Sequence, residues 1–168
     1  MSAAQTSRGP GSIHATALVI GEAGILIRGR SGRGKSALAL ALLDMAGERG
    51  LFARLIGDDR IHIEAHGHRT LASGAPGITG LIERRGIGLA RVGAEPAAVV
   101  RLVVDLLPEG EALERLPEEA AGIAALGDAR LPRLAFDATS RPNERAAAIL
   151  AALGEGVDKF VTISTHFA

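Results

Sequence analysis

Hydrophobic positions along this chain fall into short runs separated by glycines, which is the pattern of strands joined by turns. Residues 13–20 and 25–28 are two such runs, and the turn-forming segment 21–24 lies between them, so they predict a β-hairpin. Residues 35–49 are rich in Ala and Leu and are followed by Gly50, which predicts a helix that ends there.

Strands also dominate the pattern further along the chain. Residues 53–59 are apolar up to two final acids, residues 60–64 alternate between apolar and polar, and residues 69–72 suit a returning partner strand. Further strands are predicted over residues 98–106 and 134–137, and helices over residues 109–116, 118–126 and 143–153. The glycine-rich segment 73–93 is predicted to be either a mobile loop or a surface that approaches a ligand closely.

This mixture of strands and helices predicts an α/β fold. The chain of 168 residues suits one domain, and no linker or repeat divides it. We therefore expect a flexible leader over residues 1–12 and a single domain over residues 13–168.

Composition narrows the possible functions. Hydrophobic residues make up 47% of the chain but aromatic residues only 2%, so stacking platforms for single-stranded nucleic acid are not expected. The formal net charge is +0, which provides no general attraction for nucleic acid or anionic lipid. The chain has no Cys, no apolar run long enough to span a membrane and no signal-peptide pattern, so we expect a cytoplasmic protein.

The strongest chemical signal lies between a predicted strand and a predicted helix. Residues 29–36 read GRSGRGKS and fit the phosphate-binding pattern G-x-x-x-x-G-K-[ST] at every fixed position. The candidate phosphate-binding residues are Gly29, Arg30, Ser31, Gly32, Arg33, Gly34, Lys35 and Ser36. Backbone N–H groups of such a loop attract phosphate, while Lys35 suits the outer phosphates and Ser36 suits Mg²⁺. The segment predicts a nucleoside triphosphate or similar polyphosphate as ligand, the alternative being a chance glycine-rich turn.

Two acids and a histidine are candidates for the chemistry beside this loop. Asp58 and Asp59 follow a predicted strand, where one carboxylate can hold Mg²⁺ and the other can take a proton from an attacking hydroxyl. His14 lies on the strand before the phosphate-loop strand and can orient or tune an acid. The alternatives are an ordinary turn for the two acids and a structural role for the histidine.

The segment 81–88 carries a further charged group. Glu83 can supply an oxygen ligand to Mg²⁺, and Arg84 or Arg85 can offset charge on a transferred phosphoryl group. The alternative is a surface hairpin with a solvated charge cluster. Three histidines at positions 62, 66 and 68 raise the possibility of zinc, but solvated side chains at a turn are the favoured interpretation.

Taken in order, these motifs resemble the C-terminal catalytic domain of HPr kinase/phosphorylase, from about residue 13 to about residue 150. The phosphate loop matches the family's G-x-S-G-x-G-K-S, and residues 56–61, IGDDRI, resemble its VADDRV. Residues 82–88, IERRGIG, are similar to the signature EIRGLGI, and residues 114–116, ERL, resemble a segment DRLG that carries a functional arginine. His14 stands at the family's catalytic histidine.

The resemblance implies a P-loop domain with a mixed central sheet and flanking helices, related to the nucleotide-binding core of phosphoenolpyruvate carboxykinases. It implies ATP- and Mg²⁺-dependent phosphorylation of a serine of the phosphocarrier protein HPr, and assembly into a homo-oligomer, a hexamer in the family. The implied catalytic residues are His14, Lys35, Asp58, Asp59, Arg85 and Arg115, and the implied metal ligands are Ser36 and Glu83. Asp59 would deprotonate the serine.

The family's dephosphorylation segment PVRPGRN is matched only in part by residues 137–143, so the kinase direction is expected rather than the phosphorylase direction. Two other functions stay open. One is a small-molecule kinase on the same scaffold, and the other is a non-catalytic regulator that senses nucleotide. The pair Asp58 and Asp59 favours catalysis, because a sensor does not require a carboxylate placed to accept a hydroxyl proton.

Overall fold

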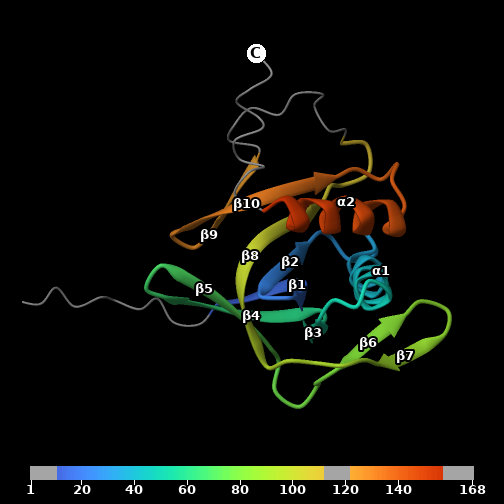
Figure 1. Cartoon of the computed structure of the whole chain (residues 1–168), viewed down its shortest axis with the longest axis horizontal. Coiled ribbons are helices and arrows are strands. Elements are labelled where there is room, and N and C mark those ends of the chain that lie inside the picture. Colours follow the sequence, from blue (N-terminus) through green and yellow to red (C-terminus); the bar gives the residue numbers. More distant parts are fainter. Residues whose placement is uncertain (1–10, 112–121, 157–168) are drawn as a thin grey trace, which may run out of the picture.

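A computed structural model describes residues 11–111 and 122–156 of the chain (Figure 1). The strands are β1 Gly11–Ile20, β2 Ala23–Arg28, β3 Ala53–Gly57, β4 Arg60–His66, β5 Arg69–Gly74, β6 Leu81–Arg84, β7 Gly88–Arg91, β8 Ala97–Leu106, β9 Ile123–Leu126 and β10 Ala129–Phe136. The helices are α1 Lys35–Glu48 and α2 Pro142–Glu155.

The central layer is a mixed sheet with the strand order β3–β1–β2–β8–β10. Strands β2, β8 and β10 are parallel, and β1 runs antiparallel to both β2 and β3. The carboxyl ends of β2, β3, β8 and β10 therefore meet at one edge of the sheet, together with the start of β1. In open α/β sheets ligands bind outside such an edge.

Two long strands connect this layer to a second one. The first half of β1 pairs with β4 while its second half pairs with β2, and β8 divides in the same way between β5 and β2. Since β4 also pairs with β5, the strands β1, β2, β8, β5 and β4 close into a ring.

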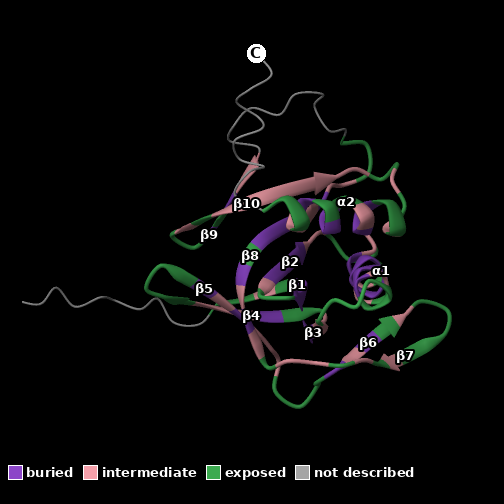
Figure 2. Ribbon diagram, viewed as in Figure 1, coloured by how far each residue is buried: buried purple, intermediate pink, exposed green. Residues whose placement is uncertain are grey.

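The core has two parts, one on each face of the central sheet. Because side chains alternate along a strand, Leu18 and Ile20 of β1 pack toward the helices, while Ala17 and Val19 pack toward β4 and β5. Helices α1 and α2 lie side by side on the first face and contribute Leu38, Leu42 and Ile149, all fully buried. Figure 2 shows this buried interior surrounded by exposed turns. Each fully buried Leu or Ile stabilises the fold by roughly 1.5–3 kcal/mol.

Most predicted elements are confirmed. The hairpin over residues 13–28, the helix after the glycine loop, the strand that precedes the two acids and the C-terminal helix all form, with shifts of one or two residues at most of their ends. The predicted β4–β5 pair is also confirmed as antiparallel.

The helix predicted over residues 118–126 is wrong at its described end. Residues 123–126 form β9, which pairs antiparallel with β10 across a turn at Gly127, where φ is +62°. Cross-strand pairing therefore overrides the helix propensity of this Ala-rich run. Residues 109–111 of the other predicted helix are not helical, and β10 begins five residues earlier than the predicted strand at residue 134.

Two other predictions meet different outcomes. The glycine-rich segment 73–93 contains the β6–β7 hairpin, which forms its own two-stranded sheet beside α1. Residues 1–10 of the predicted leader lie outside the described residues. Its last two residues, 11 and 12, belong to β1, which begins at Gly11.

Candidate functional site

The glycine loop lies at the carboxyl edge of the central sheet, between the end of β2 and the first residue of α1. Gly32 and Gly34 have φ values of +80° and +89°, a backbone region that residues with a Cβ rarely adopt. No side chain caps the start of α1, so its first N–H groups point into the loop without a side-chain acceptor. These N–H groups and the helix dipole make the loop suitable for an anion.

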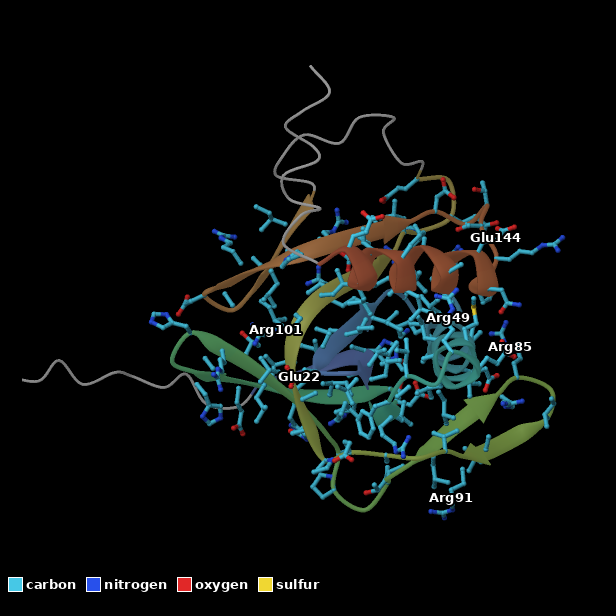
Figure 3. The ribbon with its side chains drawn as sticks, viewed as in Figure 1. Glu22, Arg49, Arg85, Arg91, Arg101 and Glu144 are labelled. Atoms are coloured by element: carbon cyan, nitrogen blue, oxygen red, sulfur yellow. The ribbon has the colours of Figure 1, made fainter. Side chains whose placement is uncertain are left out.

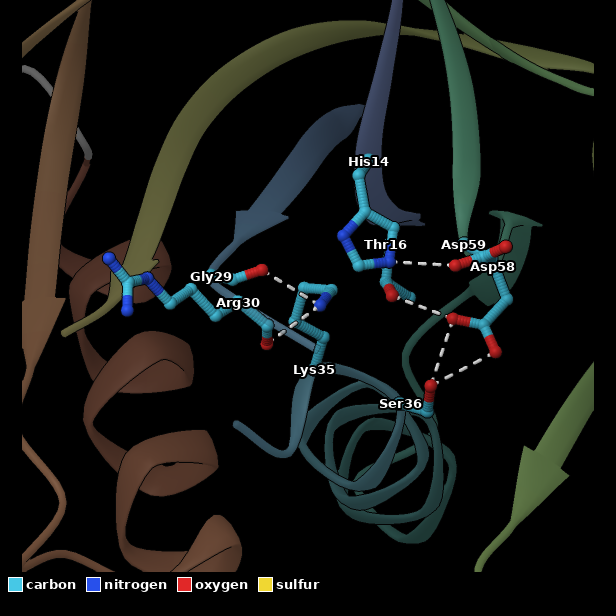
Figure 4. Close-up of polar contacts among 8 residues, drawn as sticks. All are labelled: His14, Thr16, Gly29, Arg30, Lys35, Ser36, Asp58 and Asp59. Atoms are coloured by element: carbon cyan, nitrogen blue, oxygen red, sulfur yellow. Dashed lines mark hydrogen bonds and ion pairs between the residues drawn. The ribbon is translucent and has the colours of Figure 1, made fainter. Parts of the chain in front are cut away.

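Lys35 closes the loop from inside. Its side chain is buried, and Nζ donates to the carbonyl oxygens of Gly29 at 2.8 Å and Arg30 at 3.2 Å (Figure 4). Burial lowers the pKa of Lys35, while the charges of Asp58 and Asp59 act in the opposite direction. The ammonium group is therefore fixed within the loop and held near two carboxylates.

Asp58 faces α1 from the end of β3. Its Oδ1 accepts a hydrogen bond from Thr16 Oγ1 at 2.7 Å, and its two oxygens lie 2.9 and 3.0 Å from Ser36 Oγ. A carboxylate bonded to the phosphate-loop hydroxyl is the arrangement by which P-loop proteins hold Mg²⁺. Asp58 and Ser36 therefore supply oxygen atoms of the kind that this cation prefers.

Asp59 turns the other way. Its φ of +71° is the only positive value among the described non-glycine residues, and this conformation directs its carboxylate toward β1. There Asp59 Oδ1 lies 2.7 Å from His14 Nε2, and the exposed fraction of the Asp59 side chain is 83%. Two consecutive acids thus have separate partners, Asp58 with Ser36 and Thr16, and the exposed Asp59 with His14.

The two predicted residues of the β6–β7 hairpin have different positions. The Arg85 guanidinium lies against the phosphate loop, since a Cβ at Gly32 would come within 3.7 Å of Arg85 Nη2. Glu83 lies between buried Ile82 and half-buried Arg84 but is itself exposed, on the outward face of β6. Within residues 11–111 and 122–156, no three His or acidic side chains cluster as metal ligands, so the metal role of Glu83 stays a prediction.

A cluster of arginines near the same edge was not predicted from sequence. Asp105 of β8 binds both Arg28 and Arg133, with Arg28 Nε at 2.7 Å. Burial acts to raise the pKa of Asp105, but the hydrogen bonds and charges of the two arginines outweigh it and lower that pKa. This cluster fastens the ends of β2, β8 and β10 together directly before the phosphate loop.

Sequence reasoning also missed Thr16 and Arg145. Thr16 is fully buried, and a polar residue at an inward position of an apolar strand is the signal that could have marked it. Arg145 of α2 donates to Ser140 Oγ at 3.0 Å and to the Asp137 carbonyl at 2.8 Å, which fixes the connection between β10 and α2. Its burial lowers its pKa. Arg115, named above as a catalytic candidate, lies outside the described residues.

Comparison with known proteins identifies the family. Residues 8–122 match the family described as HPr Serine kinase C-terminal domain. The chain belongs to this family. The HPr kinase/phosphorylase of Limosilactobacillus reuteri is 44% identical over 79 residues, which are 46% of this chain and 23% of the relative. The same enzyme of Pediococcus pentosaceus is 46% identical over an equal length. The match therefore spans about a quarter of these relatives' length.

A solved structure extends the likeness over most of the fold. The Hpr(Ser) kinase/phosphatase from Coxiella burnetii superposes with a TM-score of 0.69 at 26% identity, covering 86% of this chain and 97% of that one. The predicted resemblance to the HPr kinase family and the mixed α/β class are thus confirmed. Neither described helix is long and apolar enough to cross a membrane.

Proposed function

We propose that this chain is an ATP- and Mg²⁺-dependent kinase that phosphorylates a serine of HPr. The observation that carries the proposal is that the two acids after β3 have different partners, since Asp58 binds Ser36 and Asp59 binds His14. The Asp58 carboxylate lies beside the phosphate loop, and the neighbouring Asp59 carboxylate is exposed to solvent. Membership of the HPr serine kinase family and the similarity to HPr kinase/phosphorylases support HPr as the acceptor.

Nucleotide binding follows from the loop itself. The N–H groups of residues 29–36 would cradle the β- and γ-phosphates, and Lys35 would exchange its carbonyl partners for phosphate oxygens. Ser36 and Asp58 fit Mg²⁺ through their oxygen atoms, with Glu83 as a further proposed ligand, and bound Mg²⁺ would neutralise charge on the phosphates. Arg85, against Gly32, would add a positive charge on the outer side of the loop.

Proton transfer would use the second acid. As the serine Oγ attacks the γ-phosphorus, its O–H bond breaks and the proton passes to an Asp59 carboxylate oxygen. The bond between the γ-phosphorus and the bridging oxygen breaks, and ADP leaves. His14 holds the Asp59 carboxylate through the 2.7 Å contact and so orients the base. Positioning and electrostatics, rather than a covalent intermediate, would provide the rate enhancement.

The exposure of Asp59 favours a protein acceptor over a small metabolite. The Asp59 side chain is 83% exposed, so the site does not enclose a small hydroxyl compound next to this carboxylate. A folded protein can cover the carboxylate with its own surface when it binds. The kinase direction is the proposal, since the segment 137–143 matches the family's dephosphorylation segment only in part. Assembly into a homo-oligomer and a cytoplasmic location are proposed from the family alone.

The test is phosphoryl transfer from Mg-ATP to HPr of the same organism, followed by the intact mass of HPr. We expect the wild-type chain to add one phosphoryl group and Asp59→Asn to add none while still binding ATP. Asp128→Asn, at the exposed β9–β10 turn, is the matched control and should retain activity. Wild-type protein that binds ATP but leaves the mass of HPr unchanged would refute the proposal, and loss of ATP binding in folded Asp59→Asn would refute the role of Asp59 as base.

A further inference from the structure

One face of the β6–β7 hairpin packs against the rest of the described fold. Ile82 and Ala90 are directly opposite each other across the two strands, and both pack against the core beside α1. Neighbouring positions therefore point outward, and Glu83 and Leu89 form the adjacent outward pair. The hairpin pairs with no other described strand, and both residues of this outward pair are exposed.

Two large apolar side chains of this hairpin are exposed to solvent. Ile87 is 81% exposed and Leu89 is 73% exposed, which makes them the two most exposed large hydrophobic residues in the described part of the chain. Scattered single apolar residues are normal on protein surfaces. Here the two lie two residues apart at one tight turn, which the Ile87 N–H closes by donating to the Arg84 carbonyl at 3.0 Å.

This apolar turn borders the phosphate site. Arg85 belongs to the same turn and lies against Gly32 of the phosphate loop. Figure 4 shows the hairpin strand passing on the Ser36 side of the site. A protein seated on the site to present a hydroxyl would therefore meet the hairpin.

Charge selects among the possible partners. Residues 81–91 contain three arginines and one acid, although the formal net charge of the whole chain is +0. Arg91 is exposed and projects away from the body of the molecule, whereas Arg85 lies on the side toward α1 (Figure 3). Because side chains alternate along a strand, Leu89 and Arg91 share the outward face of β7, with Glu83 opposite Leu89. Arg84 lies on the other face of β6, with its Nη2 4.0 Å from Asp44. An exposed apolar side chain next to an exposed arginine complements an apolar patch bordered by carboxylates, and such pairs of patches favour docking in a defined orientation.

We propose that the β6–β7 turn docks the acceptor protein, through an apolar patch bordered by carboxylates next to the reactive serine. Ile87 and Leu89 enter that patch, and Arg91 pairs with its acidic rim. This inference rests on the proposed function, because it concerns the acceptor of the same transfer. It adds a binding surface outside the residues that handle phosphate and proton.

The experiment compares two double variants with the wild-type chain. Ile87→Ser/Leu89→Ser removes the apolar turn, while Leu51→Ser/Phe52→Ser removes two other exposed apolar residues between α1 and β3 and serves as the control. We expect the hairpin variant to raise KM for HPr by about tenfold or more, which corresponds to the loss of a central interface contact. Its kcat and its affinity for ATP should stay within about twofold of wild type, and the control should leave all three constants unchanged.

A second variant tests the charge. Arg91→Glu should raise KM for HPr about fivefold or more at low salt and less at high salt, because salt screens charges at an interface rim. An unchanged KM in both hairpin variants would overturn the docking role while wild-type transfer to HPr left the proposed function standing. A raised KM together with a smaller assembly in sedimentation would also overturn it, since the turn would then contact a second copy of this chain. Absence of transfer by the wild-type chain would refute the proposed function and this proposal with it.

Discussion

Replacing Thr16 by Val isolates one hydrogen bond of the candidate metal site. Thr16 is fully buried, and its hydroxyl donates to Asp58 Oδ1 at 2.7 Å. Valine has nearly the same volume, so the packing of β1 is preserved while the donor is lost. Asp58 then keeps the hydrogen bond from Ser36, and its carboxylate is free to rotate away from the loop.

The size of the effect follows from the charge and burial of Asp58. A hydrogen bond to a charged group is worth about 1.5–3 kcal/mol. Because Asp58 is only partly buried, water can replace some of the lost interaction, and we expect about 1–2 kcal/mol. This corresponds to a reduction of roughly 5- to 30-fold in any equilibrium constant that depends on the position of the carboxylate.

The assay is ATP affinity with saturating Mg²⁺ and again in EDTA, measured by calorimetry. If Asp58 helps to hold Mg²⁺, Thr16→Val should lower the affinity roughly 5- to 30-fold with Mg²⁺ and less than about twofold in EDTA. Thr16→Ser keeps the hydroxyl and should restore the Mg²⁺-dependent affinity. An equal loss of affinity in both conditions would refute the reasoning, because it would show a general disturbance of the loop.

Two further predictions concern neighbouring groups. Lys35→Ala should lower ATP affinity by about 100-fold or more, measured with a fluorescent ATP analogue, because it removes the one buried cation inside the loop; an affinity close to wild type would contradict the assignment of the phosphate loop. Asp105→Asn should lower the free energy of unfolding in urea by about 1–3 kcal/mol at pH 7, since it weakens the bonds to Arg28 and Arg133. The pKa of Asp105 is lowered in the folded protein from 3.8, so its contribution is complete above about pH 4 and is lost as the pH falls through the lower folded-state value. The variant and the wild type should therefore converge in stability at pH values below the folded-state pKa of Asp105, and an unchanged difference in acid would contradict the cause.

The sequence was sufficient for the parts of the site that local rules determine. The phosphate loop is defined by glycines, Lys35 and Ser36 at fixed spacing, and its strand and helix follow from short apolar periodicity. The positions of Asp58 and Asp59 near the phosphate loop were predictable, because the two acids directly follow an apolar run that predicts a strand. Their separate partners were not, since the difference depends on the positive φ of Asp59, which the pattern does not reveal.

Features that depend on distant pairing escaped prediction. β9 is an Ala-rich segment whose conformation is decided by β10, and local propensity favoured a helix there. Thr16 contacts a residue 42 positions away, and Arg28 contacts one 77 positions away. Glu83 was placed by motif alone, and the alternation of β6 turns it outward from the buried Ile82.

The pairing of β2 with β8 has a consequence for folding of the chain during its synthesis on the ribosome. The phosphate loop begins where β2 ends, and that end is held by β8, so Arg28 meets Asp105 only after 77 further residues have been added. A nascent chain that has just emerged past α1 contains the whole loop sequence but lacks the strand that fixes its start. Closure of such a long loop is slow compared with hairpin formation. The nascent chain should therefore bind ATP only once β8 has left the exit tunnel. Nucleotide binding would then follow the pairing of β2 with β8 rather than the formation of α1.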